Sequence, residues 1–130
     1  EFFGIDVERY IQHIPGLNTL CTIIVKLGGE GAIAIDSRSR SIVKVSPLKL
    51  EGLGLEARST AGCGDIFTGV FVARYLESRN LVDALEYASL AAGLKRSRIA
   101  SSDAPTRSEV EEALAYTRRK GLIDVIVRKL

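Results

Sequence analysis

The sequence predicts an α/β fold in which helices cover a sheet. Short, apolar and β-branched segments occupy the first half of the chain, helical patterns occupy the second half, and a glycine-rich turn joins them. The chain has 130 residues, 46% of them hydrophobic, which is enough to bury one core. Residues 1–130 should therefore form one domain or most of one. Because strands and helices alternate only in part, we expect mixed strand directions.

Composition excludes several classes of function. The formal net charge is +2 and the basic residues are scattered, which gives no case for nucleic-acid binding. The apolar stretches are too short to span a bilayer and no signal segment opens the chain, so we expect no membrane association and a cytoplasmic location. Cys21 and Cys63 lie far apart and His13 is the single histidine, so we expect no protein metal site and no disulfide framework.

The start of the chain predicts that further sequence lies upstream. The first residue is Glu1, and the sequence contains no methionine. The number of predicted strands is also low for a complete doubly wound sheet. We therefore expect the chain to be the C-terminal part of a longer domain whose N-terminal part is absent.

The first half of the chain predicts one helix and three strands. Residues 5–14 carry a loose helical pattern that Pro15 and Gly16 end, with His13 as a boundary residue. The apolar, β-branched run over residues 19–27 predicts a strand buried on both faces. After a glycine-rich break, the pattern predicts short strands over residues 32–36 and 42–45, a polar turn over 37–41 between them, and a loop over 47–57 that leads into an extended stretch over 55–58.

The second half predicts three helices. The first follows Asp65 and stops at Asn80, and the second runs from about residue 81 or 82 to 99, with small residues that permit close packing. The third starts at Thr106, with Glu109 at the capping-box spacing, runs to about residue 119 and is ended by Gly121. Residues 122–127 fit a final strand or an ordered tail.

The segment Gly62-Cys63-Gly64-Asp65 is the main candidate for chemistry. Two glycines flank a small residue just before a helix, so successive backbone N–H groups can point into one concavity and bind an anion. The N-terminus of the helix adds unpaired N–H groups and a positive dipole end, which suit a phosphate. Asp65 could then accept the proton of a hydroxyl that attacks the phosphate.

Simpler interpretations of these residues stay open. Aspartate is common in the first turn of a helix, and glycine before a helix is often only a turn. Cys63, at a helix N-terminus, could instead be a reactive thiol, although no CxxC pair exists and the histidine is distant in sequence.

Four segments in order strengthen the phosphate interpretation. They read VKLGGEGA over residues 25–32, STAGCGD over 59–65, ALEYASLAA over 84–92 and APTRSEV over 104–110. Together they resemble the motifs of the ribokinase, or PfkB, family of carbohydrate kinases, and the resemblance covers roughly residues 20–115. It implies a ribokinase-like three-layer sandwich, of which this chain would be the C-terminal, nucleotide-binding portion.

The resemblance also implies roles for particular residues. Asp65 would be the catalytic base, and Gly62, Cys63 and Gly64 would form the anion hole. Eight further residues would border the nucleotide: Lys26, Leu27, Gly28, Gly29, Glu30, Gly31, Thr60 and Ser89. Lys26 could also be a solvated charge at a strand end, and Ser89 a small residue in helix packing.

Three positions depart from the family's motifs. Cys63 replaces the usual Ala or Gly, which a loop that acts through its backbone tolerates. Ser59 replaces an Asp that in many members helps to hold a monovalent cation, so K⁺ dependence is left open. Ala100 and Ser101 stand where a Gly-Ala pair commonly closes the nucleotide loop.

The expected function is transfer of the γ-phosphate of ATP, with Mg²⁺ held by phosphates and water, to an alcohol group of a sugar or nucleoside. The identity of the acceptor and the formation of a homodimer are left open. The alternatives are a non-catalytic nucleotide-binding or regulatory module and a structural partner domain that binds nothing. This chain alone could also lack activity.

Overall fold

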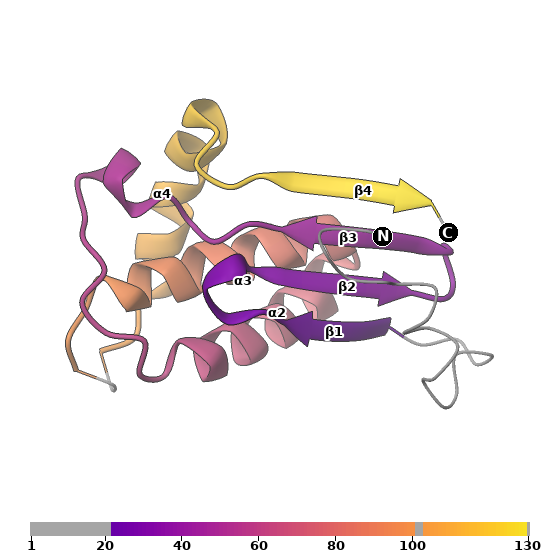
Figure 1. Ribbon diagram of the computed structural model, residues 1–130, viewed down its shortest axis with the longest axis horizontal. Coiled ribbons are helices and arrows are strands. Elements are labelled where there is room, and N and C mark those ends of the chain that lie inside the picture. The colour runs from indigo at the N-terminus through magenta and orange to yellow at the C-terminus, as the bar shows by residue number, and fades with distance from the viewer. Residues whose placement is uncertain (1–21, 101–102, 130) are drawn as a thin grey trace.

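The computed structural model describes residues 22–100 and 103–129, and it combines one sheet with a layer of helices (Figure 1). The strands are β1 (Thr22–Lys26), β2 (Ala32–Asp36), β3 (Ser41–Val45) and β4 (Val125–Lys129). The helices are α2 (Cys63–Ser78), α3 (Leu81–Arg96) and α4 (Arg107–Lys120), with two short 3-10 helices, η1 (Gly28–Glu30) and η2 (Leu50–Leu53). The helix predicted over residues 5–14, together with His13 and Cys21, lies outside the described residues.

The four described strands follow one another across the sheet in the order β1-β2-β3-β4, and every neighbouring pair is antiparallel. Short turns connect β1, β2 and β3, and such turns can join only antiparallel neighbours. The mixed strand directions that we predicted are therefore not seen in this sheet. The chain then leaves the sheet for the three helices and returns to its edge as β4 (Figure 1).

β2 is buried at all five positions, whereas β1 is only half-buried. The prediction of a strand buried on both faces is thus wrong for β1, because β1 lies at an edge of the described sheet. The side chains of β2 alternate between the two faces of the sheet and therefore belong to two separate apolar clusters. Ala32 and Ala34 belong to the core beneath the helices, whereas Ile33 and Ile35 pack on the opposite face with Ile42 of β3.

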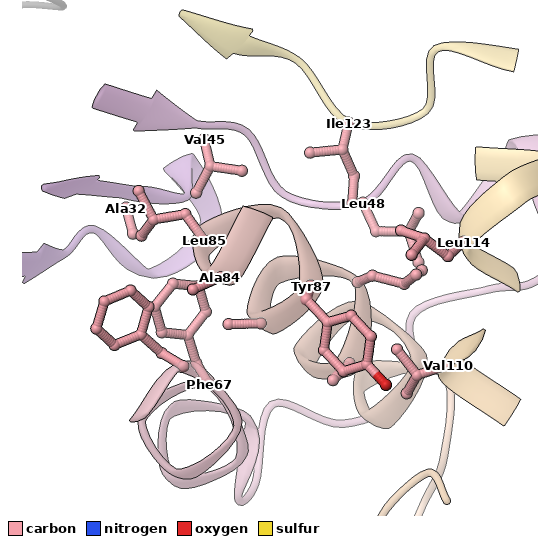
Figure 2. Close-up of a cluster of buried hydrophobic side chains, with 14 of the residues drawn as sticks. Ala32, Val45, Leu48, Phe67, Ala84, Leu85, Tyr87, Val110, Leu114 and Ile123 are labelled. Carbon is pink, nitrogen blue, oxygen red and sulfur yellow. The ribbon is translucent and has the colours of Figure 1, made fainter. Parts of the chain in front are cut away.

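The main core lies between the sheet and the helices. Figure 2 shows side chains from β2, β3, α2, α3 and α4 meeting there, among them Ala32, Val45, Phe67, Leu85 and Val110. The small residues predicted for close packing serve that purpose. A Cβ atom on Gly93 of α3 would lie 2.4 Å from Cβ of Leu48, so the loop after β3 presses directly on the helix.

The helix boundaries confirm the predicted elements and correct some of their ends. α2 begins at Cys63, two positions before Asp65, and Asn80 caps α3 by accepting the N–H of Asp83. α3 ends at Arg96, three residues earlier than predicted. The loop over residues 47–57 contains η2, and residues 55–58 form no strand.

The last two elements agree closely with the sequence. α4 starts with the predicted capping box between Thr106 and Glu109, and Gly121 ends it in the left-handed conformation with φ of 64°. The segment left open as a strand or a tail is the strand β4, paired with β3. Within the part of the chain that the structure describes, no helix is long and apolar enough to cross a membrane.

Candidate nucleotide site

The N-terminus of α2 has the backbone geometry that the glycine turn predicted. Gly62 is the N-cap and adopts a φ of 80°, which glycine reaches without strain. The N–H of Ile66 donates to the carbonyl of Gly62 at 3.0 Å and starts the helical hydrogen-bond ladder. The N–H groups of Gly64 and Asp65 therefore lie ahead of that ladder, where a helix supplies no acceptor of its own. The N–H of Cys63 donates to the carbonyl of Thr60 at 3.3 Å.

Lys26 brings a positive charge to this helix end. Its Nζ donates to the carbonyl of Gly64 at 3.3 Å and to Oγ1 of Thr68 at 3.0 Å. A Cβ atom on Gly64 would lie 3.5 Å from the same Nζ. The ammonium group, the helix dipole and the unpaired N–H groups thus lie side by side, and all three favour an anion. Lys26 is exposed at the end of β1, and its ammonium group makes these contacts at the protein surface.

The turn between β1 and β2 forms a second wall of the site. Gly28 to Glu30 make one 3-10 turn, and the N–H of Gly31 donates to the carbonyl of Gly28 at 3.2 Å. Gly31 has a φ of 94°, and a Cβ atom there would lie 2.0 Å from the carbonyl oxygen of Val45. Only glycine fits at that position, because the turn is pressed against the end of β3.

These segments surround a cleft with a volume of about 230 Å³. Eight of the predicted site residues line it: Lys26, Gly28, Gly29, Gly31, Thr60, Cys63, Gly64 and Ser89. Four predicted residues are not part of its lining. Leu27 packs into the second apolar cluster, Glu30 is exposed on η1, Gly62 is the N-cap of α2, and Asp65 follows it in the first turn of the helix.

Sequence reasoning missed several lining residues, namely Ala32, Pro47, Leu48, Phe67, Ala92, Gly93 and Arg96. Phe67 and Ala92 lie within or beside segments that were already singled out, so their place could have been anticipated. Pro47 and Leu48 carried no signal, because they belong to a loop whose position depends on its packing against Gly93. The result is a cleft with an apolar wall as well as an anion-binding end.

Ser89 was interpreted either as a residue at the nucleotide or as a small residue in helix packing, and its position is compatible with both. It is buried on α3 and lines the cleft, but its hydroxyl donates to the carbonyl of Ser46 at 2.6 Å. The hydroxyl proton is therefore used to hold the loop after β3 against α3. Ser89 shapes the cleft as a packing residue.

Asp65 is exposed in the first turn of α2, adjacent to the cleft-lining Gly64. Among the described residues no cation forms an ion pair with its carboxylate, so the oxygens are accessible to an incoming hydroxyl. Nearby, Oγ of Ser59 accepts the N–H of Ala61 at 3.1 Å and stabilises the loop before α2. Sγ of Cys63 lies 3.7 Å from the carbonyl of Ser59.

The comparisons with known proteins agree with this geometry. The sequence pattern described as pfkB family carbohydrate kinase matches residues 3–107. The chain is 29% identical over 109 residues to a 5-dehydro-2-deoxygluconokinase of Bacillus licheniformis, covering 83% of this chain and 31% of that protein. It is 29% identical over 107 residues to a ribokinase of Haemophilus influenzae, covering 82% and 32%.

Solved structures show the same likeness. The crystal structure of a ribokinase from Thermotoga maritima matches with a TM-score of 0.61 at 28% identity, covering 72% of this chain and 30% of that one. A ribokinase from Cryptococcus neoformans in complex with ADP matches with a TM-score of 0.61 at 29% identity, covering 71% and 29%. The chain spans about a third of the length of its curated relatives, 31% and 32% for the two above. Its fold is ribokinase-like, and the chain belongs to the pfkB family of carbohydrate kinases.

Proposed function

We propose that this chain is the nucleotide-binding, C-terminal part of an ATP-dependent kinase that phosphorylates an alcohol group of a sugar or nucleoside. One observation carries the proposal. Lys26 and Gly64 are 38 positions apart in the sequence, yet the Lys26 ammonium contacts the helix start beside a cleft bordered by two glycine turns. A packing role alone does not require unpaired N–H groups and a lysine to converge on one open cleft.

The residues present fit a nucleoside triphosphate. The N–H groups at the start of α2 and the Lys26 ammonium suit phosphate oxygens, and the apolar wall of Leu48, Phe67 and Ala92 suits a base. Bound ATP would supply the γ-phosphoryl group and would carry Mg²⁺ through its phosphates and water. Among the described residues, no three Asp, Glu, His or Cys side chains gather to hold a metal ion.

The chain's own residues would act mainly by positioning and by stabilising charge. Gly62, Cys63 and Gly64 would form the anion hole, with Lys26 beside it. The N–H of Cys63 donates to the carbonyl of Thr60 at 3.3 Å, so it would have to exchange that acceptor for a phosphate oxygen. Asp65 would accept the proton of the acceptor hydroxyl, because it follows the anion hole directly on a rigid helix. Gly28, Gly29, Gly31 and Thr60 would border the phosphates, because they line the cleft. Leu27 packs into the second apolar cluster and Glu30 is exposed outside the cleft lining, so neither is proposed as a contact.

The acceptor is proposed only by class. The relatives named above are kinases of ribose and of 5-dehydro-2-deoxygluconate, so a sugar or a sugar-derived alcohol is favoured over a nucleoside. A cytoplasmic location, the use of ATP with Mg²⁺ and a homodimer belong to the same proposal. Ser59 in place of the motif's Asp leaves K⁺ dependence to measurement.

Replacing Asp65 with Asn in the full-length protein tests the catalytic role. We expect kcat to fall by roughly 10²–10⁴-fold, because the amide cannot accept the proton of the hydroxyl. The affinity for ATP, measured by calorimetry, should change little. Glu112→Gln is a matched control, since Glu112 is an exposed carboxylate of α4 outside the cleft lining.

The outcomes separate the possible functions. Unchanged turnover in Asp65→Asn would refute the assignment of the base. ATP binding without phosphorylation of any sugar or nucleoside would favour the non-catalytic module. A full-length protein that binds no nucleotide would favour a structural domain.

A further inference from the structure

Lys95, near the end of α3, is a charged residue that none of the sequence motifs explains. Its side chain is completely buried, and its Nζ has no hydrogen-bond partner among the described residues. An unpaired ammonium group in such a position destabilises a fold, and exceptions of this kind concentrate at functional sites. We propose that Lys95 is a built-in cation behind the anion hole, where it supports phosphate binding and takes the place of a bound K⁺. This role rests on the function proposed above.

The antiparallel packing of α2 and α3 brings Lys95 level with the start of α2. Arg74, toward the end of α2, donates to Asp83 near the start of α3 at 2.7 Å. At the other end of the pair, the N–H of Ser59 donates to the carbonyl of Arg96 at 3.2 Å. The end of α3 therefore lies beside the loop that leads into α2. Because both helices have 16 residues, Lys95 lies level with the first turn of α2.

The side chain of Lys95 lies on the side of α3 that faces α2. Figure 2 shows Leu85 of α3 directed toward the sheet and Tyr87 directed toward α4. At 3.6 residues per turn, Lys95 falls between these two directions, on the same stripe as Ala84 and Ala88. Both alanines are fully buried in the core that includes side chains of α2. The ammonium group of Lys95 is therefore directed toward the buried side of the start of α2.

The loop before α2 does not suit a monovalent metal ion. Residue 59 is a serine, where the family's motif has an aspartate that in many members helps to hold such an ion, so the carboxylate charge is missing. Oγ of Ser59 already accepts the N–H of Ala61 at 3.1 Å. A fixed ammonium group next to this loop would also repel a second cation. These residues fit an internal lysine better than bound K⁺.

Two lysines then lie on two sides of one helix start. Lys26 contacts the carbonyl of Gly64 at the surface, where water and salt screen its charge. Lys95 lies in the interior, where screening is weaker, so its field acts more strongly on an anion at the start of α2. A charge that is fixed before the phosphate binds needs no reorganisation when it does so. This role explains why a buried, unpaired charge is kept although it weakens the fold.

Lys95→Met in the full-length protein tests the effect on phosphate binding. Methionine keeps most of the aliphatic stem and removes the charge. We expect Kd for ATP, measured by calorimetry, to rise roughly tenfold or more. Kd for AMP, which lacks the terminal phosphates, should change little, whereas a merely structural defect would weaken both nucleotides. Lys120→Met, at an exposed lysine of α4, is the matched control and should bind ATP normally.

Melting temperatures test the replacement of K⁺ without any measurement of activity. The unmodified protein should melt at the same temperature in KCl and in choline chloride of equal ionic strength. The double variant Ser59→Asp/Lys95→Ala should melt at a higher temperature in KCl, because it regains the carboxylate and lacks the competing ammonium. Ser59→Asp alone should show no such difference, since Lys95 would pair with the new carboxylate.

The outcomes that overturn the proposal are specific. A melting temperature of the unmodified protein that rises in KCl alone would show that K⁺ binds despite Lys95. A Lys95→Met variant that binds ATP as before, or loses ATP and AMP equally, would exclude the electrostatic role. If the unmodified protein bound no ATP, the proposed function would fail, and the comparison of salts would still decide whether Lys95 replaces the ion. Circular dichroism checks that each variant is folded, and Lys95→Met decides the case if the double variant is not.

Discussion

Lys95 is the residue whose environment is least expected. It lies on α3 with no exposed surface, and its Nζ has no hydrogen-bond partner among the described residues. A buried ammonium group without a partner loses its hydration and gains nothing in return. The next residue, Arg96, instead lines the cleft beside α2.

Replacing Lys95 with Met should stabilise the protein. Methionine keeps most of the aliphatic stem and removes the charge, so we expect a gain of at least about 1 kcal/mol in the free energy of unfolding. The midpoint of urea unfolding should rise with an unchanged slope. Lys120→Met, at an exposed lysine of α4, should change the midpoint far less. A loss of stability in Lys95→Met would show that the ammonium has a stabilising partner.

Residue by residue, the sequence predicted which segments line the cleft better than it predicted their contacts. Lys26 and the glycines of the two turns could be singled out because local backbone geometry and charge mark them, whereas their chemical roles remain predictions. The bond from Ser89 to Ser46 joins residues 43 positions apart, and the sequence contains no mark of it. Asp65 was assigned as a base from its motif, and that role remains a prediction.

At the scale of single elements, α4 offers the clearest test. Thr106 accepts the N–H of Glu109, and the side chain of Glu109 accepts the N–H of Thr106 in return. Thr106→Ala removes one half of this capping box and should cost about 0.5–2 kcal/mol of stability. The shift in the urea midpoint should exceed that of Ser108→Ala, an exposed position in the same helical turn. Equal shifts in the two variants would mean that the cap contributes nothing specific.

The helices and strands also show which features could not be predicted from sequence patterns. The start of α4 was predicted correctly because the capping-box signal lies within four consecutive residues of the sequence. The burial of β1 was not, because its hydrophobic pattern does not say which strand lies at the edge of a sheet. Residues 122–127 were ambiguous for a similar reason, since only pairing with β3 makes β4 a strand.

At the scale of the whole molecule, charged pairs connect the three helices. Arg74 of α2 donates to Asp83 of α3 at 2.7 Å, and both side chains are mostly buried, with 21% and 18% of their surfaces exposed. Arg118 of α4 reaches the same carboxylate at 3.3 Å. Arg74 also stacks over the ring of Tyr87 at 4.5 Å. Asp83 is therefore the carboxylate at which all three helices meet.

These pairs predict how stability depends on pH. The hydrogen bond from Arg74 lowers the pKa of Asp83 below its ordinary value of 3.8. A depressed pKa means that the pair stabilises the fold above that value and is lost as the pH falls through the folded-state pKa. Burial, aided by the bond to Glu111, raises the pKa of Tyr87 above 10.0, so its contribution is lost as the pH rises past that value. We expect the highest melting temperature between about pH 5 and pH 9.

Asp83→Asn tests the acid side of this profile. At neutral pH the variant should melt at a lower temperature than the unmodified protein, because the amide cannot form the charged pair with Arg74. The difference should shrink as the pH falls below 3.8, because the unfolded chain then binds a proton at this carboxylate before the folded protein does, and the advantage of the charged pair is lost. Asp103→Asn, at a side chain that is 56% exposed, should melt close to the unmodified protein throughout. If the gap for Asp83→Asn stayed constant from pH 7 to pH 3, the carboxylate would not be the group whose protonation loosens the three helices.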